Sequence, residues 1–479
     1  MAGIWSAQGA LRRKPIERIE ETEGSGEQLS RALGLGQLTA IGVGGIIGAG
    51  IFTLAGTVAN GTAGPAVLVS FLIAGLASAA AALSYAEFAG LIPKAGSAYT
   101  YGYAVLGEIG GWFIGWDLLL EYTAIVSVVA IGISGYFAFL VQEMGADLPT
   151  WMLGAPGTGE GHKVNLFAVL LCLLVAFLLT RGIKSAARFE TVVVVLKVAV
   201  VLLVILVGFF HVKTGNWTPF FPHGISGAFT GAATVFFAVF GYDAMSTAAE
   251  ESRDSQRHMP KAIVYSLAIS MVLYVLACLV LTGMQHYTEI DKESGFSSAF
   301  KSVGLGGIAD VIAVGAIIGI LTVMFTFMLG VTRVWFSMSR DGLLPKWFAK
   351  TDPKRHVPTR VTWIVGIASA FIAGFLPIEE AAELTNIGIL LAFVVVCVAV
   401  IVLRYRQPEL PRSFRCPGMP WVPAVGVVFS LWLTTFLAWQ TWVRFAVWFV
   451  IGLVIYFAYS YRRSELAKRQ QGVEGREGP

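Results

Sequence analysis

Apolar residues run along the chain in long stretches, and charged residues gather between them. A helix needs about 20 mostly apolar residues to cross the hydrocarbon core of a bilayer. Twelve such windows occur, at residues 38–60, 66–92, 113–141, 164–181, 187–210, 229–250, 262–284, 308–336, 361–377, 384–403, 421–440 and 441–461. The last two share one apolar run, which we divide near Trp439 because its length fits two helices. The pattern predicts an all-α polytopic membrane protein with twelve transmembrane helices.

The composition agrees with that prediction. Of 479 residues, 56% are hydrophobic and 13% are charged, and the mean hydropathy is +0.72, whereas soluble domains have about 25% charged residues. The six histidines are scattered and three of the four cysteines (Cys172, Cys278 and Cys397) lie in apolar segments, with Cys416 in a loop. We therefore expect no disulfide framework, no metal site and no bound cofactor.

The basic residues predict the orientation. If the N-terminus is cytoplasmic, 28 of the 34 Lys and Arg residues fall on that side and five on the other. Loops rich in Lys and Arg stay in the cytoplasm, so we expect a protein of the cell membrane with both termini inside. Residues 1–37 and 462–479 would then be cytoplasmic tails, and the +4 net charge reflects topology rather than nucleic-acid binding.

The first segment contains the sequence "IGVGGIIGAGIF", with glycines at positions 42, 44, 45, 48 and 50. A nucleotide-binding loop is excluded, because no Walker lysine follows. A G-x-x-x-G packing face formed by Gly44 and Gly48 accounts for only two glycines. The alternative is that the helix unwinds near Gly48–Gly50. Unwound backbone at membrane depth must line a cavity or be buried in protein, and its N–H and carbonyl groups could hold a carboxylate and an ammonium.

The sixth segment is interrupted in the same way. In "VFFAVFGYDAMSTAAEE", Gly241 and Asp243 follow an apolar run. Matched interruptions in two halves are typical of transporters built from inverted five-helix repeats. We expect the repeats at 38–210 and 229–403, followed by two further helices at 421–461.

One lysine and four acids inside predicted spans are candidate functional groups. Lys197 is the only basic one far from both ends of its span, and such a group marks a functional site by default. Burial disfavours the charged form, which would let Lys197 exchange a proton near physiological pH; the alternative is a structural lysine paired with carbonyls or a carboxylate.

The acids are Glu87, Asp117, Glu121 and Asp243. Asp117 and Glu121 would share one face in the first turns of their helix, where the helix dipole favours negative charge, or Glu121 would recognise a basic side chain. Glu87 and Asp243 are candidates for pH-sensitive or gating contacts.

The segments "GGIIGAGIF", "YAEFAGLIPKAGSAYTYGY", "FFAVFGYDAMSTAAEE" and "SRDGLLP" resemble signature segments of the amino acid-polyamine-organocation (APC) transporter superfamily. The resemblance covers the chain from about Leu33. "GWDLLLEY" and "FRCPGMPWVP" are more similar to its cationic amino acid transporter branch.

That resemblance implies where a substrate would bind. The N–H groups of Ala49 and Gly50 would hold the carboxylate, with Gly48 at the turn, and the ammonium would meet backbone carbonyls of Ile46, Phe237 and Phe240. The break beside Gly241 makes Phe237 or Phe240 a possible lid. Many relatives have Ser or Thr in place of Ala49, so a hydroxyl contact is missing here.

The resemblance also implies a lysine at the place of Lys197 that substitutes for a sodium ion in proton-coupled members. We therefore expect no enzyme but a permease that imports L-amino acids, cationic or small and neutral, together with a proton by alternating access. An exchanger without proton coupling is the main alternative. A major-facilitator transporter would have its long loop between segments 6 and 7, and a membrane enzyme or receptor would need a reactive cluster. An accessory small membrane subunit stays undetermined.

Overall fold

A computed structural model describes residues 33–91, 97–181, 187–246, 252–352 and 358–465. These residues form helices and no strand, apart from one isolated bridge between Leu33 and Ser252. The prediction of an all-α protein is confirmed. Most of the predicted N-terminal tail (1–32) and C-terminal tail (466–479) lies outside the described residues, as does the end of the sixth segment at 247–251.

The helices and their bounds are α3 Leu35–Ile46, α4 Ala55–Val58, α5 Val67–Leu91, α6 Ser97–Val105, α7 Glu108–Glu143, α8 Leu166–Thr180, α9 Ala187–Gly208, α10 Gly224–Thr234, α11 Tyr242–Ser246, α12 Ser255–Met284, α13 Gly295–Ser302, α14 Gly306–Arg340, α15 Thr359–Phe375, α16 Ile378–Arg406, α17 Trp421–Thr434, α18 Trp439–Ile455 and α19 Tyr461–Arg463. Short 3-10 turns lie at Gly64–Ala66, Thr150–Met152, Phe209–His211, Thr214–Trp217, Phe236–Val239 and Tyr287–Glu289, and π-helical turns at Gly50–Leu54, Ala59–Ala63 and Tyr456–Ser460.

Among the described residues, seven helical stretches are long and apolar enough to cross a membrane. They are Leu35–Leu91, Glu108–Glu143, Val192–His211, Ser255–Met284, Gly306–Arg340, Ile378–Arg406 and Trp439–Arg463. Three shorter apolar helices, α8, α15 and α17, lie at further predicted segments. The chain is thus a multi-pass membrane protein, while twelve spans and the inverted repeat stay predictions.

The first segment is not a continuous helix. Helix α3 ends at Ile46, and Ile47 has extended backbone angles (φ −71°, ψ 106°). A π-helical turn starts at Gly50 and leads into α4. Gly64, with a φ of +61°, then turns the chain toward α5.

The sixth segment is broken as well. Helix α10 ends at Thr234, a single 3-10 turn follows, and Phe240 is extended (φ −99°, ψ 166°). Gly241 has a φ of +130°, a conformation that residues with a β-carbon rarely adopt. Helix α11 begins directly after it.

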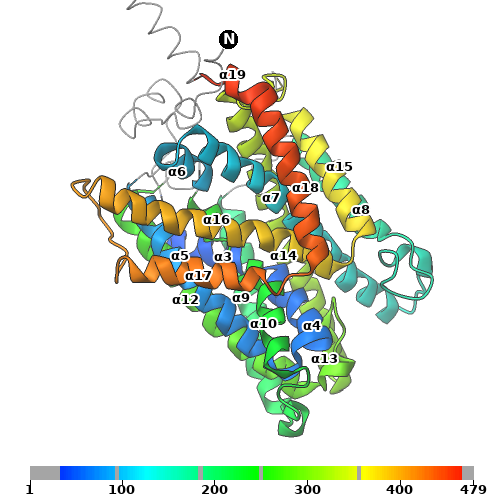
Figure 1. Cartoon of the computed structure of the whole chain (residues 1–479). Helices are drawn as coiled ribbons and strands as arrows, with labels where there is room; N and C mark the ends of the chain where they lie inside the picture. Colours follow the sequence, from blue (N-terminus) through cyan, green and yellow to red (C-terminus); the bar gives the residue numbers. More distant parts are fainter. Residues whose placement is uncertain (1–32, 92–96, 182–186, 247–251, 353–357, 466–479) are drawn as a thin grey trace, which may run out of the picture.

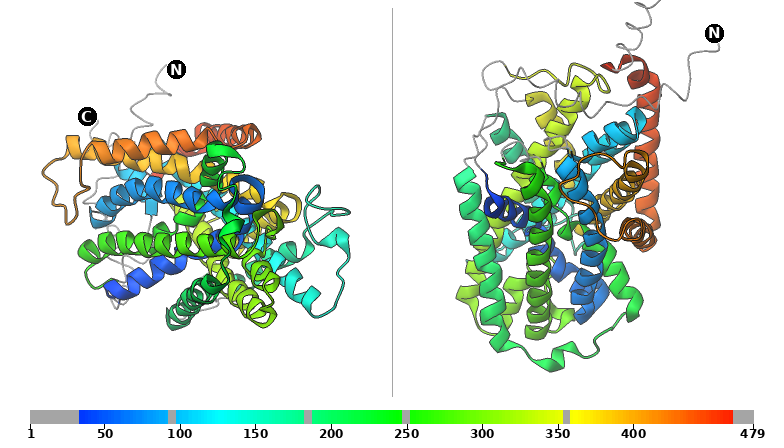
Figure 2. Two further views of the ribbon diagram at one scale, coloured as in Figure 1. Left: turned by 90° about the horizontal axis from the view of Figure 1, so that it is seen from below. Right: turned by 90° about the vertical axis from the view of Figure 1, so that its left-hand side faces the viewer.

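The broken segments lie inside the bundle. Helix α7 packs against α14 and α16, while α12 packs against α5 and α3. Figures 1 and 2 show α5, α12 and α17 running side by side, and α8 beside α15 at one edge of the molecule. Helix α18 is tied to α7 by Trp116 and Trp448, whose indole N–H groups each donate to the other's backbone carbonyl, at 2.9 and 3.1 Å.

Candidate functional site

The two broken segments touch each other backbone to backbone. A β-carbon added to Gly241 would lie 2.6 Å from the Gly45 carbonyl oxygen, and one added to Gly45 would lie 2.8 Å from the Gly241 oxygen. A second close approach lies nearby, where a β-carbon on Gly50 would be 2.2 Å from that of Ala238. Only glycine permits this approach, so the glycines bring the two interruptions together.

Gly44 and Gly48 do not form a common packing face. A β-carbon on Gly44 would meet Val194 of α9 at 2.3 Å, whereas one on Gly48 would meet Val323 of α14 at 2.9 Å. The backbone changes direction at Ile47, so residues four apart no longer point the same way. The G-x-x-x-G interpretation of these two glycines is wrong.

Side chains from three other helices bind the backbone freed at the breaks. The Tyr274 hydroxyl of α12 lies 2.7 Å from the Ile46 carbonyl and 3.1 Å from that of Ala238, so it bridges the two segments. Ser78 of α5 donates to the Val239 carbonyl at 3.1 Å. Backbone groups left unpaired away from water cost free energy, so these contacts stabilise the unwound conformation.

Asn386 of α16 binds this freed backbone through both its side-chain oxygen and its side-chain nitrogen. Its side-chain oxygen accepts from the Phe237 N–H at 2.6 Å, and its amide nitrogen donates to the Thr234 carbonyl at 2.7 Å. The residue is fully buried. Sequence reasoning missed both Asn386 and Tyr274. The available signal was a polar group inside an apolar helix, as in "LTNIGILL" and "MVLYVLA".

The residues expected to hold a substrate carboxylate lie at the start of the second half of segment 1. Ala49 caps the π-helical turn, is 1% exposed and carries no hydroxyl. The Phe52 N–H bonds back to the Gly48 carbonyl at 3.2 Å. The first N–H groups of a helix lack intrahelical acceptors, and the dipole there favours an anion.

Two of the carbonyls expected to bind an ammonium already accept one hydrogen bond each. The Ile46 oxygen accepts from Tyr274, and the Phe237 oxygen accepts from the Phe240 N–H at 3.2 Å. A carbonyl has two lone pairs, so each retains one for a further donor. The Phe240 ring packs edge-on against Tyr242 and Phe393, with centroids 5.5 and 5.4 Å away. Phe240 is therefore a packing residue, which leaves Phe237, 7% exposed, as the candidate lid.

Lys197 lies directly beside the first break. Its side chain is 2% exposed, and its ammonium donates to the Gly44 carbonyl at 2.8 Å. Its aliphatic stem lies against α14, where a β-carbon on Gly319 would be 2.9 Å from the lysine Cγ. The lysine thus joins α9 to α3, two residues before α3 ends.

Asp117 and Glu121 do not lie in the first turns of their helix. Helix α7 begins at Glu108, so both are more than two turns inside, where the helix dipole no longer acts. The account based on the helix N-terminus is wrong. All four carboxyl oxygens are buried and have no hydrogen-bond partner among the described residues. Asp243 of α11, by contrast, accepts a hydrogen bond from the Tyr122 hydroxyl.

Glu87 lies in a different setting. Its carboxylate accepts from Arg404 at 3.1 Å, from Arg412 at 2.9 Å and from the Cys416 N–H at 2.8 Å. It therefore ties α5 to the end of α16 and to the loop that follows. A carboxylate flanked by two guanidinium groups suits a structural or gating contact.

Among the described residues, no group of three or more His, Cys, Asp or Glu is placed to hold a metal ion. The features of the site are backbone groups, one lysine and carboxyls.

A family model described as "Amino acid permease" matches residues 33–459. The chain belongs to the amino acid permease family. The resemblance to the APC superfamily is thereby confirmed, and families of this kind comprise transporters.

Several relatives of the permease are similar over nearly its whole length. A methylthioribose transporter of Bacillus subtilis (strain 168) is 45% identical over 458 residues, which cover 96% of this chain and 99% of the relative. The branched-chain amino acid permease BcaP of the same organism is 45% identical over 459 residues, covering 95% and 98%. A vacuolar cationic amino acid transporter 4 of Arabidopsis thaliana is 37% identical over 407 residues, covering 83% and 68%. The resemblance to the cationic branch is thus confirmed, while the named cargoes of the relatives differ.

Proposed function

We propose that the permease is a secondary active transporter that imports an L-amino acid together with a proton by alternating access. The observation that carries this proposal is the crossing of two interrupted helices at Gly45 and Gly241, beside the buried ammonium of Lys197. Interrupted helices that meet inside a bundle supply backbone groups of both polarities. We expect both termini to face the cytoplasm of a cell-membrane protein.

The crossing suits a zwitterion. The helix start at Ala49 and Gly50 offers N–H groups for a carboxylate, and the carbonyls of Ile46 and Phe237 lie on the other side of the break. These groups recognise the part that all L-amino acids share. The substrate side chain would then be selected by residues of α7, α11 and α14.

Lys197 is the proposed coupling group. A buried ammonium is stabilised here by a carbonyl of the very segment that must rearrange when the substrate arrives. Loss of its proton would weaken that contact, and this would link protonation to the conformation of segment 1. Glu121, Asp243 and Asp117 remain candidates for specificity or gating, and Glu87 for gating at the end of α5.

Uptake into proteoliposomes tests the proposal. Labelled alanine, leucine, arginine and lysine should be offered with and without an inward proton gradient, and methylthioribose should be added as a competitor because one relative carries that name. We expect at least one amino acid to accumulate only with the gradient. If no amino acid is accumulated or exchanged, the proposal is wrong.

Exchange without a proton is the second candidate, since the buried carbonyl contact of Lys197 also suits a permanently charged lysine. Counterflow at equal pH on both sides separates the two. An exchanger reaches its full rate when the vesicles contain unlabelled substrate, whereas a symporter accumulates substrate with empty vesicles and a gradient.

Lys197→Met keeps an unbranched side chain of nearly the same length and removes the exchangeable proton. We expect substrate binding to remain measurable and gradient-driven accumulation to disappear. The matched control is Lys213→Met, which removes an exposed lysine beyond the C-terminal end of α9. Undiminished gradient-driven uptake by Lys197→Met would exclude the coupling role.

A further inference from the structure

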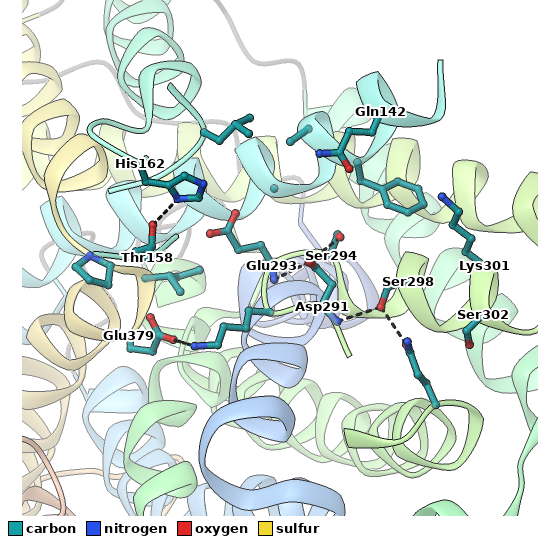
Figure 3. A pocket seen from close by; sticks show the side chains of 18 of the residues that line it. Gln142, Thr158, His162, Asp291, Glu293, Ser294, Ser298, Lys301, Ser302 and Glu379 are labelled. Carbon is teal, nitrogen blue, oxygen red and sulfur yellow. Dashed lines mark hydrogen bonds and ion pairs between the residues drawn. The ribbon is translucent and has the colours of Figure 1, made fainter. Parts of the chain in front are cut away.

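A cavity of about 950 Å³ lies where the end of α7 meets two loops and the start of α16. We call it the loop cavity; it is lined by residues between Gly135 and Gln142, between Leu153 and His162, between Gln285 and Ser302, and at 377–379. Figure 3 shows polar side chains from all these elements reaching into it. It is separate from the crossing of the broken helices, whose glycines do not line it.

The loop cavity adjoins the second half of segment 1. The Thr57 hydroxyl donates to the Lys292 carbonyl at 2.6 Å, and a β-carbon on Gly56 would lie 2.6 Å from the Asp291 carbonyl. On the other side, a β-carbon on Gly135 of α7 would lie 2.3 Å from the Glu293 Cβ. The turn at 291–294 therefore fits between α4 and α7, and its Glu293 borders the cavity.

Most charged groups of the loop cavity are already paired. Lys292 binds Glu379 at 3.1 Å, and Lys301 binds Glu143 of α7. Asp291 accepts from two backbone N–H groups and from the Ser294 hydroxyl, so it caps its own turn.

The Glu293 carboxylate differs from these groups. Among the described residues it has neither an ion pair nor a side-chain hydrogen bond. In Figure 3 the Glu293 side chain points toward the His162 side of the cavity and away from Lys301. His162 itself bonds to the Thr158 hydroxyl at 2.9 Å. The cavity thus holds the Glu293 carboxylate without a counter-charge in the described part of the chain, while its two lysines, Lys292 and Lys301, are paired with glutamates.

We propose that the loop cavity is an entry site in which Glu293 binds the ammonium or guanidinium group of a solute before it reaches the broken helices. Opposite charge at the mouth of a partly enclosed cavity raises the local concentration of a cation. The inference rests on the proposed transport function for one point, that the solute moves from this cavity to the broken helices. Binding of a cation by Glu293 does not itself require transport.

The entry site should respond to pH. Burial, Asp291 and Glu379 raise the pKa of Glu293 to about 8, while Lys292 lowers it. The other groups around the cavity are Lys301 on α13, Glu143 on α7 and His162 in the loop before α8. A carboxylate binds a cation only when ionised, so affinity should be high at pH 9 and fall as the pH is lowered through 8.

The probe is n-butylammonium chloride, which has no carboxylate for the broken helices. Its binding to the purified full-length protein in detergent is measured by isothermal titration calorimetry, with sodium butyrate at the same ionic strength as the reference. We expect Glu293→Gln to lower the affinity at pH 9 about fivefold, as for one partly exposed ion pair. Asp147→Asn, an exposed acid of the same loop region outside the cavity lining, should leave it unchanged.

The wild-type protein gives a second measurement that needs no variant. Lowering the pH from 9 to 7 should weaken n-butylammonium binding about threefold in the wild type and leave Glu293→Gln unaffected. Equal affinity of wild type and Glu293→Gln at pH 9, or a wild-type affinity that does not change with pH, would overturn the proposal. Proteoliposome uptake is scored separately, so failure of transport and failure of this site are distinguishable.

Discussion

Glu87 and Glu121 are both glutamates buried in long apolar helices, yet their surroundings are opposite. Glu87 is 1% exposed and accepts hydrogen bonds from two arginines and one backbone N–H. Glu121 is fully buried, and neither of its oxygens has a hydrogen-bond partner among the described residues. Burying an acid without partners is costly. A fully partnered acid stabilises the fold, whereas a partnerless one points to a role that stability does not explain.

The largest effect is expected at the partnered acid. Glu87→Ala leaves Arg412, 1% exposed, buried without its counter-charge, and loss of one partner of a buried ion pair costs about 3–5 kcal/mol. Thermal unfolding in detergent micelles measures this loss. The control is Glu380→Ala, whose pair with Arg444 is partly exposed and should cost no more than about 1 kcal/mol. Equal losses for the two variants would contradict the assignment of Glu87 as a structural contact.

Asn386→Ala extends the comparison to a neutral group. The change strands the Phe237 N–H and the Thr234 carbonyl inside the bundle, and each such group costs about 1–3 kcal/mol. We expect a stability loss of about 2–4 kcal/mol and loss of substrate uptake. Thr385 is the buried neighbour whose hydroxyl, among the described residues, bonds within its own helix, to the Ala381 carbonyl, so Thr385→Ala should retain uptake. If both variants transport alike, Asn386 does not hold the break.

Tyr274→Phe removes only a hydroxyl. The ring and its edge contact with Phe71 remain, so the expected loss of stability is about 1 kcal/mol, measured by chemical unfolding in micelles. Tyr265→Phe on the same helix is 49% exposed and should change stability by less than about 0.5 kcal/mol. A larger loss at Tyr265 than at Tyr274 would be inconsistent with a bridge between the broken segments.

The smallest effect on stability is expected at the partnerless acid. Glu121→Gln breaks no hydrogen bond in the described structure, so we expect it to lower the free energy of unfolding far less than Glu87→Ala does. The dependence of uptake on pH should change instead, because an ionisable group is lost. A stability loss comparable to that of Glu87→Ala would mean that Glu121 has a partner after all and would remove the contrast between the two acids.

The sequence could predict where the backbone is interrupted. A helix cannot carry five glycines in twelve positions without weakening, and Gly241 stands between apolar and polar residues. The sequence could also identify Lys197 as a candidate, because a single charged residue deep in an apolar segment marks a functional site by default. These features are local, and the residues concerned display them regardless of the rest of the fold.

The partners of these residues could not be predicted. Asn386 binds Phe237, 149 positions earlier in the chain, and Arg412 binds Glu87, 325 positions earlier. Such pairs depend on how the helices are arranged, which hydrophobic periodicity does not determine. The same limit explains the wrong account of Asp117, because the start of α7 lies five residues before the predicted apolar window.

The Tyr274 hydroxyl carries one hydrogen, although two carbonyls lie within its reach. Rotation about the C–O bond can pass that hydrogen from the Ile46 carbonyl to the Ala238 carbonyl without moving either segment. A cation that displaced the hydroxyl from Ile46 would therefore leave no donor stranded, and the number of hydrogen bonds would be conserved. The Tyr274 hydroxyl can thus change its hydrogen-bond acceptor while the backbones of both broken segments stay in place.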